Sequence, residues 1–139
     1  MNARILIVDD AATVRMYHRK LLSEAGWQTE EACNGVEALE RLHGADREAV
    51  FDLLVVDINM PKMDGYRLVQ QLRSNPDLPQ PPVLMISTES QASDSQQAFS
   101  IGANSYLIKP VAPQALVIAA ALMMGDAQAA RCAVEGKKR

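Results

Sequence analysis

Polar side chains that can bind a cation or a phosphoryl group follow four short apolar runs of this sequence. The runs and the residues after them are 5–8 with Asp9 and Asp10, 53–56 with Asp57 and then Asn59, 83–86 with Ser87 and Thr88, and 106–108 with Lys109. Carboxylate oxygens are ligands for Mg²⁺, and an Asp carboxylate can also act as a nucleophile toward phosphorus. These residue types indicate metal-assisted phosphoryl chemistry if the fold brings them together.

Helix-period segments alternate with the apolar runs, which predicts an α/β fold of five βα units around a parallel sheet. The expected strands are 5–8, 27–32, 53–56, 83–86 and 106–108, and the expected later helices are 36–42, 66–72, 93–101 and 113–124. The first helix should run from the residues after Asp10 to Gly26, with Val14, Tyr17, Leu21 and Ala25 at helical spacing. Strand 27–32 is the weakest of the five and is expected at an edge.

This fold prediction also predicts a site. In an open parallel sheet the ligand crevice lies outside the carboxyl ends of the strands. The four strand ends carrying Asp9, Asp10, Asp57, Ser87 and Lys109 should therefore meet at one rim although they are distant in sequence.

Three carboxylates at one rim repel one another by roughly 3 kcal/mol per pair at about 5 Å and an effective dielectric constant near 20. A hard divalent cation would offset that repulsion, and Mg²⁺ is the expected ion, with Mn²⁺ as an alternative. Lys109 would supply further positive charge. Asp57 would then accept a phosphoryl group, while Lys109 and Ser87 would contact the phosphoryl oxygens.

Each of these residues alone has a simpler interpretation. An Asp after a strand is more often a helix N-cap, a lone Ser87 would be a turn residue, and a lone Lys109 would be a surface charge. Only the joint pattern, with four strand ends on one rim, favours the functional interpretation.

Bulk properties limit the remaining possibilities. The chain has 139 residues and a net charge of −3, which fits one globular domain without a basic stripe for nucleic acid. The longest apolar run, 115–124, is about half of what a bilayer span needs, so we expect a cytoplasmic protein that binds neither nucleic acid nor membrane. The domain should cover residues 1–125, and residues 126–139 should form a frayed tail.

The cysteines and histidines suggest no site of their own. Cys33 and Cys132 lack metal-ligand or redox spacing. His18 and His43 lie in helical patterns without partners, and we expect them to face solvent or to cap a helix.

The sequence resembles the response-regulator receiver family, especially stand-alone chemotaxis receivers of the CheY type, over about residues 3 to 124. The matching segments are ILIVDD at 5–10, LVVDINMPKMDG at 54–65, ISTE at 86–89, GA at 102–103 and YLIKP at 106–110. The resemblance implies a doubly wound (βα)5, flavodoxin-like sheet with strand order 2-1-3-4-5. It also implies a cis peptide before Pro110 and a turn at Gly65 in which positive φ suits glycine.

The resemblance further implies the role of each residue. Asp57 would be the phosphoacceptor. Asp10, Asp57 and the Asn59 main-chain carbonyl would bind Mg²⁺ directly, and Asp9 would act through metal-bound water. Ser87 and Tyr106 would form the switch, in which Ser87 moves toward the phosphoryl group and Tyr106 rotates into the vacated space. Asn59, Thr88 and Glu89 would tune access and phosphoryl lifetime, and Thr88, where many relatives have Ala or Gly, would narrow access for small donors and water.

These roles imply a phosphorylation-activated signalling switch of a two-component system rather than a conventional enzyme. A histidine kinase of the CheA type would be the phosphodonor, and a flagellar switch component or another effector would be the target. A phosphorelay intermediate or phosphate sink, and a receiver-like module that never turns over phosphate, are the alternatives. A phosphatase of the haloacid-dehalogenase type is disfavoured because Asn59 stands where those enzymes have a second, proton-exchanging Asp.

Overall fold

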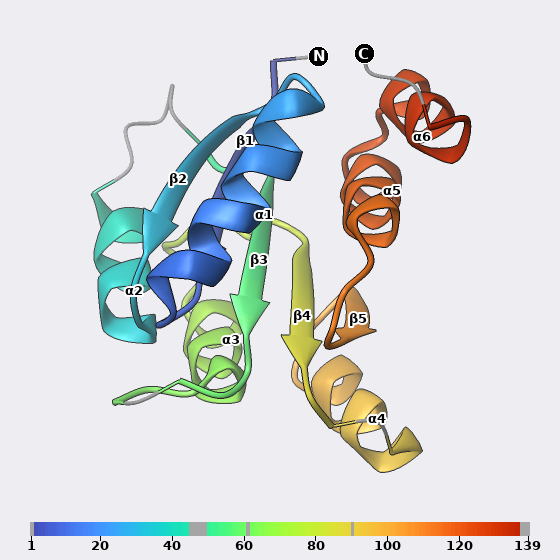
Figure 1. The fold of residues 1–139 in the computed structure, drawn as a ribbon. Helices are drawn as coiled ribbons and strands as arrows, with labels where there is room; N and C mark the ends of the chain where they lie inside the picture. Colours follow the sequence, from blue (N-terminus) through green and yellow to red (C-terminus); the bar gives the residue numbers. More distant parts are fainter. Residues whose placement is uncertain (1, 45–49, 61, 90, 137–139) are drawn as a thin grey trace.

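Five parallel strands form one sheet in the order β2-β1-β3-β4-β5, which confirms the expected topology. The strands are β1 (Arg4–Val8), β2 (Gln28–Ala32), β3 (Leu53–Asp57), β4 (Val83–Ser87) and β5 (Ser105–Ile108). The computed structural model describes residues 2–44, 50–60, 62–89 and 91–136. Pro61, in the segment 54–65 that carries the resemblance, and the basic residues Lys137, Lys138 and Arg139 lie outside the described residues. All five strands end at the same edge of the sheet (Figure 1).

Helices cover both faces of this sheet. They are α1 (Ala12–Glu24), α2 (Gly35–His43), α3 (Gly65–Ser74), α4 (Ala92–Ser100), α5 (Pro113–Met124) and α6 (Ala127–Val134). Successive strand residues point to opposite faces, so Leu6 and Val8 pack with α2, α3 and α4, whereas Ile5 and Ile7 pack with α1, α5 and α6. The chain is therefore doubly wound, and the central strands β3 and β4 are buried along their whole length.

Local sequence signals explain several helix ends. The Asn34 side chain accepts a hydrogen bond from the Glu37 main-chain N–H and so caps α2, as asparagine commonly does at a helix start. Pro113 begins α5, where its missing N–H and fixed φ cost nothing. Gly125 then ends α5 with a left-handed backbone at φ 75°.

The buried stripe of α1 differs from the prediction. Tyr17 is 45% exposed, whereas His18 is buried at 6% exposure beside the fully buried Leu22. The expectation that His18 faces solvent or caps a helix is therefore wrong. A period of 3.6 residues predicts the spacing of the buried residues but not which side of the helix faces the core. Because histidine is polar, we expected the side that carries His18 to face solvent.

The C-terminal segment is also more ordered than expected. Residues 127–134 form α6, which packs against α5 and buries Ala129 and Ala130. Asp126 caps α6 by accepting from the Ala129 N–H at 3.1 Å, and it also accepts from the Trp27 indole N–H at 3.0 Å. The expectation of a frayed tail is therefore wrong for the described part of that segment. Helix α6 lies at the end of the sheet opposite to the strand tips (Figure 1).

Arg73 of α3 fixes the turn between α4 and β5. Its guanidinium donates to the Gly102 carbonyl at 3.0 Å and to the Asn104 side chain at 3.0 Å. Gly102 has φ 111°, and a Cβ there would lie 2.6 Å from Arg73 Cγ. The glycine thus permits both the turn and the close approach of the arginine.

Candidate functional site

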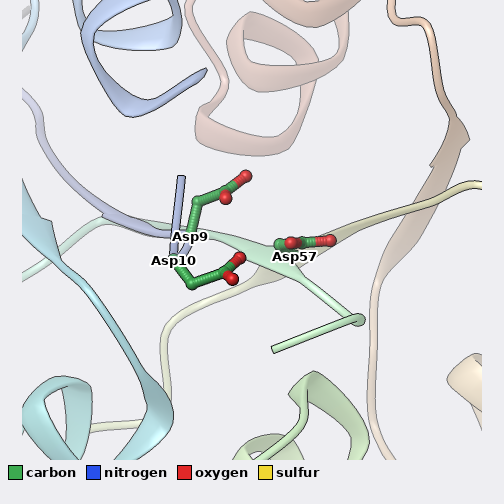
Figure 2. A group of neighbouring side chains, drawn as sticks. All are labelled: Asp9, Asp10 and Asp57. Atoms are coloured by element: carbon green, nitrogen blue, oxygen red, sulfur yellow. The ribbon is translucent and has the colours of Figure 1, made fainter. Parts of the chain in front are cut away.

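Three carboxylates meet at the carboxyl edge of the sheet. Asp9 and Asp10 follow β1, and Asp57 ends the neighbouring strand β3. One carboxylate oxygen from each lies within 4.8 Å of the other two. Figure 2 shows the three side chains extending side by side into the same region. The parallel topology therefore brings together the carboxylates that the sequence placed at separate strand ends.

Lys109 joins this cluster from the end of β5. Its ammonium lies 2.9 Å from Asp57 Oδ1, and Asp57 is only 3% exposed. The Lys109 N–H also donates to the Ser87 carbonyl at 2.7 Å, which continues the pairing of β5 with β4. The Lys109–Pro110 peptide is cis, as the resemblance implied.

Asp9 is held by its own turn. Its Oδ1 accepts from the Ala11 N–H at 2.9 Å, and its main-chain N–H donates to the Ala32 carbonyl at 3.1 Å. Burial raises the pKa of the Asp9 carboxyl, the Ala11 hydrogen bond opposes this rise, and repulsion from Asp57 and Asp10 adds to it. The raised pKa means that the neutral, protonated form of Asp9 is favoured more than in a free aspartate.

The loop after Asp57 is tightly packed against the strand. The Asn59 N–H donates to Asp57 Oδ1 at 3.3 Å, and the Gly65 N–H donates to the Ile58 carbonyl at 2.9 Å. A Cβ at Gly65 would lie 2.7 Å from the Asp57 carbonyl oxygen. The glycine is needed for this close approach and not for a positive φ, which the structure places at Lys62 instead (φ 66°). That part of the expectation for Gly65 is wrong.

Ser87 and Thr88 line the neighbouring strand end. Ser87 is fully buried, and its hydroxyl oxygen accepts from the Glu89 N–H at 3.0 Å. This contact leaves the hydroxyl proton available for another acceptor. Thr88 is exposed, and its hydroxyl accepts from the Asn59 side-chain amide at 3.4 Å, so the two residues link the loops after β3 and β4.

Two tyrosines bind the segment after β4. Tyr106 of β5 donates its hydroxyl to the Glu89 carbonyl at 2.8 Å. Tyr66, which the sequence did not single out, lies at the start of α3 and donates to the Asp94 carbonyl at 3.4 Å. Burial first, and then nearby Tyr106 and acidic groups, raise the pKa of Tyr66 to about 12, so its hydroxyl keeps its proton as a donor.

The donor set fits a hard divalent cation. All three side chains in the cluster are carboxylates, and no His or Cys joins them among the residues that the structure describes. Oxygen-only ligands of this kind suit Mg²⁺ or Mn²⁺ better than softer metals. Asp9, Asp10 and Asp57 are thus the side chains that would hold such an ion.

A doubly wound α/β domain with its polar groups at the carboxyl edge is the class that the fold and the site define. Within that class, the family model "Response regulator receiver domain" matches residues 5–121. The chain belongs to the response regulator receiver domain family.

Individual relatives agree with this assignment. The chain is 39% identical over 114 residues to "Chemotaxis protein CheY1" of Helicobacter pylori, a match that covers 81% of this chain and 90% of that protein. It is 40% identical over 117 residues to "Response regulator MprA" of Mycobacterium ulcerans, covering 84% of this chain but only 48% of that protein. The solved structure of the chemotaxis response regulator CheY4 of Vibrio cholerae superposes with a TM-score of 0.80 at 32% identity and covers 88% of this chain and 99% of that one. Within the described part of the chain, no helix is long and apolar enough to span a membrane.

Proposed function

We propose that this domain is a phosphorylation-activated signalling switch in which Asp57 accepts a phosphoryl group from a histidine kinase. The observation that carries the proposal is the contact between Lys109 and Asp57 at 2.9 Å inside a cluster of three carboxylates. A cation fixed beside a buried carboxylate, with two further carboxylates as metal ligands, suits phosphoryl transfer to that carboxylate.

Asp57 is oriented for attack by its hydrogen bonds. The contacts from Lys109 and from the Asn59 N–H both fall on Oδ1, so Oδ2 is the oxygen expected to attack phosphorus. The new O–P bond forms as the P–N bond of a phosphohistidine breaks, and the electron pair of that bond stays with the departing imidazole. No proton has to leave Asp57 because it attacks as a carboxylate.

The remaining side chains stabilise charge on the transferred group. Mg²⁺ held by Asp9, Asp10 and Asp57 would neutralise part of the charge on the phosphoryl oxygens. The Lys109 ammonium contacts one of these oxygens, and the Ser87 hydroxyl donates its free proton to another. The Asn59 and Thr88 pair limits the approach of small donors and water, which lengthens the phosphoryl lifetime.

The switch follows from movement of Ser87 toward the phosphoryl group. Ser87 now accepts from the Glu89 N–H, and Tyr106 donates to the Glu89 carbonyl, so displacement of Ser87 acts on the segment that Tyr106 binds. Tyr106 would turn inward and change the surface formed by α4, β5 and α5. A protein target then binds the changed surface.

Phosphoryl labelling tests the acceptor. Wild type incubated with Mg²⁺ and a labelled histidine kinase or acetyl phosphate should gain an acid-stable, base-labile label, whereas Asp57→Asn should gain none. Asp77→Asn removes an exposed carboxylate outside the site and should label like wild type. Equal labelling of Asp57→Asn and wild type would refute the assignment.

Chemotaxis is the pathway that we propose, because the relatives that align along most of their length carry the name CheY. Beryllofluoride with Mg²⁺ mimics the phosphorylated state. A purified flagellar switch protein should bind the domain more tightly in that state than without it, and Asp57→Ala should not respond. Rapid back-transfer to the kinase with unchanged affinity for the switch protein would instead favour a phosphate sink.

A further inference from the structure

Arg15 of α1 connects the acidic turn to the edge strand β2. Its Nη1 donates to the Asp9 main-chain carbonyl at 2.6 Å, and its Nε donates to Glu31 Oε1 of β2 at 3.1 Å. The Arg15 side chain is only 16% exposed. The guanidinium therefore fills a fixed position between the strand end and the helix.

The Asp9 carbonyl belongs to the peptide group that joins Asp9 to Asp10. A peptide group is planar, so holding its oxygen fixes the plane and limits the direction in which the Asp10 side chain leaves the backbone. Asp10 is exposed, so its direction depends on its main chain more than on neighbouring side chains. On the other side of this peptide group, Asp9 is already held through the Ala11 and Ala32 hydrogen bonds.

We propose that Arg15 is a positioning residue that orients the Asp9–Asp10 peptide so that both carboxylates face the cation site, and that Glu31 holds Arg15 in place. The proposal rests on the proposed function, because it concerns the same metal site. A planar guanidinium has separate nitrogens for the two acceptors, which a lysine ammonium lacks. Groups that orient metal ligands typically change metal affinity by about 10- to 100-fold when removed.

Arg19 provides a matched control. Its guanidinium contacts the same Glu31 carboxylate at 3.2 Å, but its side chain is 58% exposed and its contact is with Glu31 Oε2. Arg19→Gln removes one positive charge and one ion pair from the same carboxylate as Arg15→Gln does. Only Arg15→Gln also removes the hydrogen bond to Asp9.

The experiment measures the Mg²⁺ dissociation constant by titration calorimetry without any phosphodonor, together with urea unfolding in EDTA. Arg15→Gln should weaken Mg²⁺ binding by about tenfold, and Arg19→Gln should stay within about twofold of wild type because exposed charges are screened by salt. Arg15→Lys should fall between them. Glu31→Gln should weaken binding less than Arg15→Gln, and it keeps the test valid if Arg15→Gln fails to fold.

Equal weakening by Arg15→Gln and Arg19→Gln would show that only charge matters and would overturn the proposal. So would unchanged Mg²⁺ affinity in both Arg15→Gln and Glu31→Gln while wild type binds the ion. If wild type itself binds no Mg²⁺ and accepts no phosphoryl group, the proposed function fails instead.

Discussion

Replacement of Asp57 by asparagine should stabilise the metal-free protein, even though it should abolish the proposed phosphoryl acceptance. The carboxylate oxygens lie within 4.8 Å of one another, so at an effective dielectric constant near 20 each pair repels by at least about 3.5 kcal/mol, and Asp57 has two such neighbours. The attraction between the Lys109 ammonium and Asp57 Oδ1 at 2.9 Å contributes about 6 kcal/mol in the opposite direction. The repulsion thus exceeds the attraction by at least about 1 kcal/mol, and burial of the carboxylate at 3% exposure adds a desolvation cost.

Asparagine keeps an acceptor for Lys109 but carries no charge. Asp57→Asn should therefore raise the free energy of unfolding by about 1 to 3 kcal/mol in EDTA. Saturating Mg²⁺ should stabilise wild type more than the variant, because a ligand stabilises the state that binds it more tightly. The difference between the two proteins should shrink or reverse with the ion present.

Urea unfolding followed by far-UV circular dichroism, in EDTA and with Mg²⁺, measures both effects. Asp77→Asn, which removes an exposed carboxylate outside the site, should change the stability by no more than about 0.5 kcal/mol. If Asp57→Asn is less stable than wild type in EDTA, the ion pair with Lys109 outweighs the repulsion and the reasoning is refuted.

Two further predictions concern the protein away from the acceptor. Asp126→Ala should lower the free energy of unfolding by about 2 to 4 kcal/mol, since it removes the cap of α6 and leaves the buried Trp27 N–H without that acceptor. Asp126→Asn should lower the free energy of unfolding less in the same urea experiment. Equal losses of stability in the two variants would contradict this reasoning. Burial, and next Lys109, lower the pKa of His18, so the unfolded chain takes up a proton below pH 6.5 before the folded chain does. The free energy of unfolding should therefore fall with decreasing pH more steeply in wild type than in His18→Leu. The difference between the two slopes should be at most about 1.4 kcal/mol per pH unit. Parallel pH profiles of the two proteins would refute a buried neutral His18.

The meeting of the acidic cluster with Lys109 could be predicted because it follows from topology alone. Residues at the carboxyl ends of adjacent parallel strands must lie at one edge, whatever their side-chain conformations. A correct strand assignment was enough to predict that Asp9, Asp57 and Lys109 lie close together.

Other features depend on contacts that local sequence patterns do not encode. The bond from Arg15 to the Asp9 carbonyl requires one rotamer of a long side chain, and Tyr66 reaches a carbonyl 28 residues away. Helix α6 is short, and its burial depends on Trp27, which lies 99 residues before Asp126. A segment of eight residues has little helical stability without such packing.

The anchoring of the turn after α4 by Arg73 determines how that helix can move. The guanidinium bonds fix the carboxyl end of α4 through Gly102, whereas the hydroxyl groups of Tyr66 and Tyr106 bind the other end and the segment before it. If the tyrosine bonds at the amino end rearrange while the Arg73 bonds persist, α4 would tilt about its carboxyl end and would not slide. For nine residues, about 13 Å long, a tilt of roughly 10° would displace the amino-terminal end by about 2 Å. In the proposed switch, such a tilt would magnify a small displacement of Ser87 along α4.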